Sequence, residues 1–313
     1  MNKPELPARI AIRALSHVVI EVANLDRARS FYAERLGLRA SAAAWPVDGE
    51  MCLACSPGQW LVLKEVKAPR TFAGTGVHQA YAASPVAITG IVNGLTAATV
   101  PVQRYHEDRP AERDDNCYFV DPDGNRIQLV RRETTVGPGV CGLDHVAVLA
   151  SDMEWAEDFY CGLLGLPVDH RVGVNTEDYV RARAWGEGRD DMAPGTRRWD
   201  ERYRDIPGGK PGQGRRVPRP NMQMYLRTGA STFGIYLANS HEQEPPPHLA
   251  FGSPRTGFAV DRPELDRAAA LLADARVALE GPIEHGSRSL MAASLHFRDP
   301  CGNFIELCAP RGP

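Results

Sequence analysis

LSHVVIEVANLDRARSFYAERLGL, residues 15–38, is the stretch that decides the fold, because the chain carries a second copy of it. Residues 143–166 read LDHVAVLASDMEWAEDFYCGLLGL, and the two copies align without a gap, so that His17 falls on His145. In each copy an alternating apolar segment predicts a strand, an Asn or Asp follows as helix N-cap, and a helix ends at a glycine. The chain therefore repeats one strand, turn and helix unit, opened each time by a histidine.

Two further pairs of similar segments occur in the same order in both halves. YFVDPDGNRIQLV (118–130) resembles HFRDPCGNFIELC (296–308), and both predict a strand, a DPxGN turn and a second strand. Between these landmarks, VHQAYAASP, which contains His78, resembles PHLAFGSP, which contains His248. Three pairs of segments in one order indicate a duplicated chain.

The length of 313 residues corresponds to about two domains. We place the first domain at residues 1–135 and the second at 140–313, because polar residues and glycines interrupt the pattern between them. The second half is longer than the first. Most of the excess lies in residues 181–220, a stretch rich in Gly, Pro and Arg that is typical of an inserted loop.

Composition narrows the classes of function. The apolar share of 43%, the charged share of 24% and the net charge of −3 are those of an ordinary globular protein. We expect no nucleic-acid partner, because binding a phosphate backbone needs clustered excess cations. No apolar run approaches the roughly 18 residues of a membrane span, and the N-terminus lacks the apolar stretch of a signal peptide. Seven cysteines scattered through apolar segments add to the prediction of a cytoplasmic protein without a membrane partner.

Three residues of the second half are of metal-binding types and stand at landmarks of the repeat. His145 opens the first strand, His248 opens a later strand, and Glu306 lies on the last strand. Two imidazoles and one carboxylate form the facial triad that leaves open positions on Fe(II) or Mn(II), and the same donors with a water molecule suit zinc. These residues are therefore candidate ligands of a divalent metal.

The first half has the corresponding histidines but a different last residue. His17 and His78 are present, whereas Gln128 stands where the second half has Glu306. A neutral amide oxygen is a much weaker donor to a divalent cation than a carboxylate. The first half is therefore predicted to have lost its metal site, with His17 as a relic of the duplication.

The paired SHVVIEV, helix and FYxxxLGL segments and the DPDGNRIQL and DPCGNFIEL ends resemble the vicinal oxygen chelate superfamily. This superfamily includes glyoxalases, bleomycin resistance proteins and extradiol ring-cleaving dioxygenases. The resemblance covers nearly all of residues 13–310. It implies an α+β fold of four βαβββ modules, two per half, in which each pair forms an open barrel-like mixed sheet around a metal-binding cleft.

Two-domain type I extradiol dioxygenases are the members that this chain resembles most. That resemblance implies a metal held by His145, His248 and Glu306, a small aromatic substrate, dioxygen as cosubstrate and a homodimer. Glyoxalases use a fourth protein ligand, and Tyr236 stands near that place in the second half. The metal would keep more open positions, which favours the dioxygenase over the lyase.

Other residues of the second half are predicted to assist the chemistry. The pocket histidine of the extradiol family is missing, and His296 stands in place of its tyrosine. An imidazole titrates near neutrality, so His296 is our preferred proton donor and acceptor, while an arginine could pair with a substrate carboxylate. The residues predicted to act in catalysis are His296, His285 and Tyr236. Those predicted to bind the substrate are Arg255, His241 and Tyr225.

The predicted function is an Fe(II)-dependent, extradiol-type dioxygenase that cleaves a catechol-like aromatic ring, with Mn(II) or Zn(II) as alternative metals. Two alternatives stay open. One is a metal-free binding protein of the bleomycin-resistance kind, and the other is a glyoxalase-like lyase or isomerase that uses its metal as a Lewis acid. Metal content and oxygen dependence separate these three functions.

Overall fold

The computed structural model describes residues 9–41, 45–72, 76–104, 116–133, 137, 139–150, 153–172, 223–237 and 250–311. The predicted insert, residues 181–220, lies outside the described residues. His241 and His248 lie outside them as well. None of the helices in the described ranges is long and apolar enough to cross a membrane.

Four modules follow one another along the chain, each with a strand, a helix and three further strands. Module 1 consists of β1 (Ala14–Val22), α1 (Leu25–Leu36), β2 (Arg39–Ala40), β3 (Glu50–Ser56) and β4 (Gln59–Glu65). Module 2 consists of β5 (His78–Ala83), α2 (Pro85–Ala97), β6 (Gln103–Arg104), β7 (Asn116–Val120) and β8 (Arg126–Arg131). Module 3 consists of β9 (Val140–Ala150), α3 (Met153–Glu157), the π-helical turn η2 (Asp158–Leu163), β10 (Val168–Val172), β11 (Gln223–Thr228) and β12 (Ser231–Leu237). Module 4 consists of β13 (Arg255–Ala259), α6 (Arg262–Asp274), β14 (Leu279–Glu284), β15 (Met291–Arg298) and β16 (Phe304–Pro310).

Helix α1 begins and ends where the sequence predicts. The Asn24 side chain accepts a hydrogen bond from the backbone N–H of Arg27 at 2.8 Å, which satisfies one of the free N–H groups of the first turn. Gly37 ends the helix with a φ of 74°, a left-handed conformation that glycine adopts without strain. Tyr32 and Leu36, one turn apart, are fully buried and form the core-facing side of the helix.

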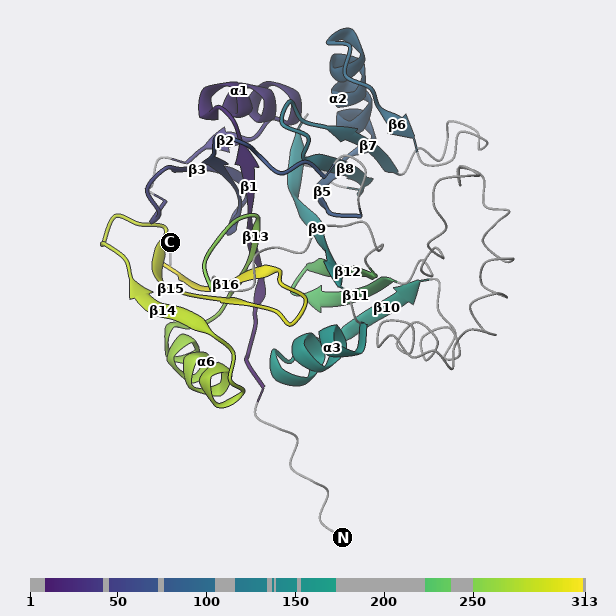
Figure 1. The fold of residues 1–313 in the computed structure, drawn as a ribbon. Coiled ribbons are helices and arrows are strands. Elements are labelled where there is room, and N and C mark those ends of the chain that lie inside the picture. The colour runs from purple at the N-terminus through teal and green to yellow at the C-terminus, as the bar shows by residue number, and fades with distance from the viewer. Residues whose placement is uncertain are drawn as a thin grey trace.

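Strand pairing joins modules from different halves of the chain. The first sheet has the order β14-β15-β16-β13-β1-β4-β3-β2 and so combines modules 4 and 1. The second sheet has the order β10-β11-β12-β9-β5-β8-β7-β6 and combines modules 3 and 2. In each sheet two modules meet at an antiparallel seam, β1 with β13 or β5 with β9. Figure 1 shows β1, from the start of the chain, beside strands from its end.

The predicted class is confirmed: the protein is α+β, with two tandem copies of a βαβββ pair and open, mixed sheets. The expectation that the two modules of one half share a sheet is wrong. The short connection from β8 to β9 leads back into the same sheet, where the two strands are separated only by β5. Neighbouring strands lie about 5 Å apart, so this connection needs to span only about 10 Å.

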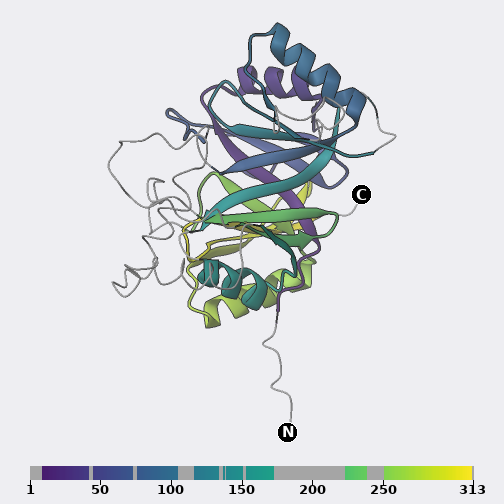
Figure 2. The same ribbon diagram turned by 90° about the vertical axis from the view of Figure 1, so that its right-hand side faces the viewer.

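The helices of each half of the chain lie on the same side, although the strands of each half belong to two different sheets. Figures 1 and 2 show α1 and α2 of the first half together on one side of the sheets, and α3 and α6 of the second half on the opposite side. One hydrophobic core runs through all four modules. At its middle the rings of Phe233 and Phe258, from different sheets, meet edge to face with centroids 5.2 Å apart.

Residues of the repeated motifs hold the two modules of each half together across the sheets. Tyr32 of the FY pair on α1 donates to the carboxylate of Asp121 in the DPDGN turn at 2.9 Å. Asn125 of the same turn donates to the backbone carbonyl of Glu21 on β1 at 2.9 Å. These contacts explain why the FY and DPxGN motifs occur together.

The second half repeats this arrangement. Tyr160 donates to Asp299 at 2.8 Å, and Asn303 donates to the carbonyl of Leu149 at 2.7 Å. Both tyrosines are fully buried, and both aspartates are nearly so. The motif residues are therefore structural clamps between modules rather than parts of a site.

Removing either tyrosine hydroxyl should destabilise the protein. We expect Tyr32→Phe and Tyr160→Phe each to lower the free energy of unfolding by about 1 to 3 kcal/mol, because a buried carboxylate loses a hydrogen-bond donor. Urea unfolding followed by circular dichroism measures this change. Ser30→Ala, on the exposed side of α1, is the control and should change the free energy by less than about 0.5 kcal/mol. Equal stability of all three variants would contradict the clamp.

Candidate metal sites on the two sheets

The site residues predicted from the sequence fall into two separate groups. On the second sheet lie His145, Tyr225 and Tyr236. On the first sheet lie Arg255, His296 and Glu306, with His285 directly after β14. The cross-half pairing of modules causes this division. His145 and Glu306 therefore do not meet, and the predicted ligand set of His145, His248 and Glu306 is not assembled in the described part of the chain.

The two seams have the same register, which relates the positions of one sheet to those of the other. His145 on β9 pairs with Ala80 on β5, and His17 on β1 pairs with Gly257 on β13. In both cases the histidine of the repeated motif lies opposite a residue with little or no side chain. The Gly257 position needs this, because a Cβ there would lie 2.0 Å from Cε1 of His17.

This register corrects one alignment made from the sequence. His78 precedes the small residue of β5 by two positions, and Arg255 precedes that of β13 by two positions. The helices that follow begin at matching N-caps, Ser84 and Asp261. The counterpart of His78 is therefore Arg255 and not His248.

On the second sheet, the two histidines form a buried pair whose rings point their Nε2 atoms at each other. Nε2 of His78 lies 3.0 Å from Nε2 of His145. The other ring nitrogens are anchored, since Nδ1 of His78 lies 2.8 Å from the carbonyl oxygen of Gly76 and Nδ1 of His145 lies 2.9 Å from Oδ1 of Asp144. We call His78 and His145 the second-sheet pair.

The anchors decide which nitrogens carry protons. A carbonyl oxygen can only accept, so Nδ1 of His78 donates to Gly76. Burial, reinforced by the nearby His145, lowers the pKa of His78 to about 3, so at neutral pH its Nε2 holds a lone pair. Burial alone would raise the pKa of Asp144, but hydrogen bonds and charges from His145 and Arg132 lower it, so this carboxylate also accepts.

With both Nδ1 atoms donating, two neutral rings would face each other with two lone pairs 3.0 Å apart. That contact is repulsive unless a cation lies between the lone pairs, either a proton on one ring or a metal ion. Adjacent ligands of an octahedral ion with bonds of about 2.1 Å are about 3.0 Å apart, which matches the observed spacing. An Nδ1 bound to a carbonyl or carboxylate is the usual outer support of a metal-binding histidine.

A third donor comes from the last strand of module 2. Gln128 on β8 pairs with Ala80 on β5 and is buried. Its side chain lies near enough to His78 to act on the pKa of that histidine, raising it against the larger effect of burial. Two imidazoles and one amide oxygen are donors that a divalent ion accepts, so the second-sheet pair with Gln128 fits a metal.

Three tyrosines surround the second-sheet pair. The ring centroids of Tyr118 and Tyr236 lie 5.6 and 5.7 Å from that of His78, and the centroid of Tyr225 lies 5.8 Å from that of His145. The hydroxyls of Tyr225 and Tyr236 are 2.5 Å apart. Burial, together with Tyr225, raises the pKa of Tyr236 well above its ordinary value, so its hydroxyl stays a donor at neutral pH.

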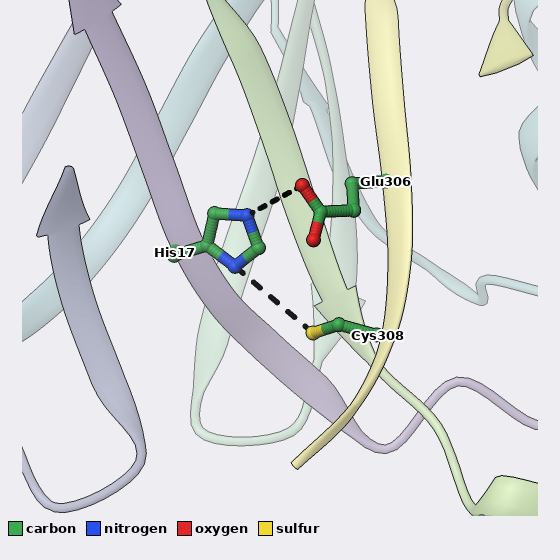
Figure 3. A group of neighbouring side chains, drawn as sticks. All are labelled: His17, Glu306 and Cys308. Carbon is green, nitrogen blue, oxygen red and sulfur yellow. Dashed lines mark hydrogen bonds and ion pairs between the residues drawn. The ribbon is translucent and has the colours of Figure 1, made fainter. Parts of the chain in front are cut away.

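On the first sheet, His17, Glu306 and Cys308 bring ligand-type atoms within 4.8 Å of one another (Figure 3). Nε2 of His17 lies 3.2 Å from Oε2 of Glu306, and Nδ1 lies 4.0 Å from the sulfur of Cys308. Burial raises the pKa of the Cys308 thiol, which therefore stays protonated and is a poor ligand.

Arg255 already binds the carboxylate of Glu306 in this group. Its Nε donates at 2.7 Å to the same Oε2 of Glu306 that His17 contacts. Its two terminal nitrogens donate to the carboxylate of Glu50 at 2.9 and 2.8 Å. Although burial acts to raise the pKa of Glu306, the charges of His17 and Arg255 hold it well below its usual value. A guanidinium fixed on the ligand oxygen repels a divalent ion, so a metal does not fit this group as it stands.

His296 and His285 extend the first-sheet group toward the surface. Oγ of Ser294 lies 2.8 Å from Nε2 of His285 and 3.0 Å from Nε2 of His296. Nδ1 of His296 lies 3.7 Å from Oε2 of Glu306. Burial lowers the pKa of His296 to about 4, so its ring is neutral at physiological pH. The predicted catalytic histidines thus lie beside Glu306, but away from the second-sheet pair.

Comparison with known proteins identifies the family of the chain. The family model for the Glyoxalase/Bleomycin resistance protein/Dioxygenase superfamily matches residues 14–129 and 142–307. No curated protein sequence matches the chain.

Solved structures of this fold resemble the protein over nearly its whole length. A Bacillus subtilis protein assigned provisionally as a dioxygenase is 14% identical, with 97% of this chain and 87% of that chain covered and a TM-score of 0.62. Glyoxalase I from Zea mays is 16% identical, with coverages of 95% and 92% and a TM-score of 0.59. The 2,3-dioxygenase LapB from Pseudomonas sp. KL28 is 16% identical, with coverages of 97% and 95% but a TM-score of only 0.33. At these identities the likeness to the Bacillus subtilis and Zea mays structures establishes the fold and no activity.

Sequence reasoning recognised His78 and Gln128 but assigned them to a relict site, and it missed Tyr118 and Glu50. The start of the helix that follows each strand is the sequence signal that would have given the correct alignment of His78. Matching the helix starts at Ser84 and Asp261, rather than the histidines, places Arg255 opposite His78.

Acid should destabilise the protein partly through His296. Its pKa of about 4 lies below the value of about 6.5 of an unfolded chain, so between these pH values the unfolded state binds a proton that the folded state does not. Its stabilising contribution is complete above about pH 6.5 and is lost as the pH falls toward 4, by up to roughly 1.4 kcal/mol per pH unit. Urea unfolding of wild type and His296→Asn between about pH 7 and 5 should show a shallower loss in the variant. Parallel curves would contradict this assignment.

Proposed function

Because the chain belongs to the Glyoxalase/Bleomycin resistance protein/Dioxygenase superfamily, we propose that it is an enzyme dependent on one divalent metal, with its active site on the second sheet. His78 and His145 are the proposed ligands, with the amide oxygen of Gln128 as third donor. The proposal replaces the ligand set expected from the sequence, because that set is divided between the sheets.

One observation carries the proposal. The second-sheet pair presents two facing lone pairs 3.0 Å apart in a buried place, with both Nδ1 atoms anchored to acceptors. A histidine pair that served only the fold would more simply turn one Nδ1 toward an acceptor and let one Nε2 donate to the other. Here both Nδ1 atoms carry the proton of a neutral ring, so neither Nε2 can donate to the other. A cation bound between the two Nε2 atoms relieves the repulsion of their lone pairs.

A bound divalent ion would act as a Lewis acid on a substrate with two neighbouring oxygens, as a carbonyl or an enediol offers. The protein's own groups then position the substrate. Tyr118, Tyr225 and Tyr236 bring aromatic rings around the second-sheet pair, which suits a planar substrate. The hydroxyl of Tyr236, held protonated, can donate a hydrogen bond to a substrate oxygen on which negative charge develops.

The neutral donor set favours chemistry without a change of oxidation state. Two imidazoles and an amide donate less charge than two imidazoles and a carboxylate, so an iron held here would be a weaker reductant of dioxygen. We therefore propose isomerase or lyase chemistry as the first candidate reaction.

Extradiol ring cleavage of a catechol-like aromatic is the second candidate, and Tyr118 favours it. Tyr118 on β7 pairs with Gln128 on β8 as His296 pairs with Glu306 in the other sheet. This is the position where the extradiol family carries its tyrosine. The second sheet therefore combines two histidines with that tyrosine and departs from the family pattern at Gln128.

Metal analysis tests the site. We expect wild type purified without oxygen to hold about one divalent ion per chain. His78→Ala and His145→Ala should lose it, and Asp144→Asn should bind the metal about 10 to 100 times more weakly, because the outer support of His145 is gone. His17→Ala and Glu306→Gln, from the corresponding positions of the first sheet, are the matched controls and should keep the metal.

Two results would count against the site. Metal that survives His145→Ala but is lost in Glu306→Gln would place the ion on the first sheet. Absence of any divalent ion, with aromatic ligands still bound in the presence of a strong chelator, would support the metal-free binding protein.

Oxygen dependence separates the two candidate reactions. Wild type is assayed with catechols and with α-hydroxycarbonyl compounds, with and without dioxygen. We expect turnover of the carbonyl substrates to be unchanged without oxygen, and Tyr236→Phe to lower kcat roughly 100-fold with little change in KM, because the lost donor acts on developing charge. Oxygen uptake with a yellow ring-opened product would favour ring cleavage instead.

A further inference from the structure

The first sheet holds an arginine where the second sheet holds a metal-type histidine. The seams share one register, so Arg255 and His17 correspond to His78 and His145. We propose that the guanidinium of Arg255 is the resident cation of the first sheet. It takes the place that a divalent ion would have, and it keeps His17 and Glu306 as a latent metal site that one substitution would open.

The remaining donors of a metal site are already in place. Nε2 of His17 lies 3.2 Å from Oε2 of Glu306, and both side chains are almost completely buried. Glu306 occupies on β16 the position that Gln128 occupies on β8, because each pairs with the small residue of its seam. An imidazole at position 255 would complete a set of two histidines and one carboxylate, the facial triad that suits Fe(II), Mn(II) or Co(II).

Charge explains why the native group excludes a metal. Arg255 is 2% exposed and lies between two carboxylates, those of Glu306 and Glu50. Although burial acts to lower the pKa of Arg255, these two carboxylates raise it above its ordinary value, so the guanidinium stays charged. A divalent ion at Glu306 would have to share one oxygen with a fixed positive charge and would lose the attraction that normally holds it.

Replacement of Arg255 by histidine leaves Glu50 with two other partners. Nε1 of Trp45 donates to Glu50 at 2.9 Å, and the ammonium of Lys64 lies 4.0 Å from it. An Arg255→His variant therefore does not leave a buried carboxylate alone, which would be strongly destabilising. The histidine is also shorter than the arginine, so no added bulk enters the core.

Cobalt(II) binding tests the proposal in a background without the second-sheet ligand. We start from His145→Ala and add Arg255→His. The double variant should bind about one Co(II) per chain and show the visible absorption of bound cobalt, with an affinity at least 100-fold above that of His145→Ala alone. Adding His17→Ala or Glu306→Gln should abolish the gain. Arg255→Gln, which removes the charge without supplying an imidazole, is the control and should gain much less.

The proposal is overturned if the folded double variant gains no cobalt, or if it gains cobalt that is unaffected by His17→Ala. Circular dichroism and thermal unfolding establish that each variant is folded. A second measurement keeps the native Arg255. His145→Ala with and without His17→Ala should bind the same amount of Co(II), because Arg255 keeps the metal away from His17. A loss of Co(II) on adding His17→Ala would show that Arg255 does not exclude the metal. Neither result depends on the second-sheet pair, so failure of the proposed active site and failure of this proposal are distinguishable.

Discussion

Two antiparallel seams, β1 with β13 and β5 with β9, are the interaction on which the rest of the structure depends. Each seam joins a module from the first half of the chain to one from the second. Each also places a motif histidine beside a residue of the opposite module, His17 near Arg255 and His145 near His78. In the first sheet the guanidinium of Arg255 lies between Glu50 and Glu306. In the second sheet the two Nε2 atoms face each other 3.0 Å apart, where the proposed metal ion would supply the positive charge.

The clamps made by Tyr32 and Tyr160 connect different pairs of modules from those that the seams connect. They tie together the modules of one half, whereas the seams tie together the halves. A buried phenol on a buried carboxylate is costly to separate, because each group loses its partner in a place that water does not reach. The two sets of contacts close a ring of four modules, in which every module is bound to one neighbour by backbone pairing and to another by side chains.

Much of this could be read from the sequence, and the reasons are local. Caps such as Asn24 and turns such as DPxGN act within a few residues, so the helices and the ends of the modules were predictable. The choice of partner for β1 was not, because two modules of similar pattern both offer a strand with a free edge, and backbone hydrogen bonds do not distinguish them. That single ambiguity separated His145 from Glu306, and a chance likeness around His248 concealed the role of Arg255.

The interleaving of halves also bears on how such a chain can change by descent. A site built from both copies needs residues from each, so a change in either copy alters the site and the two copies constrain each other's evolution. Exchange of one half between two homologous genes would bring together His78 and His145, or Arg255 and Glu50, from different lineages. Breaking the gene in two would still leave both products obliged to assemble. The duplication thus created a single inseparable unit from parts that look, along the chain, like two.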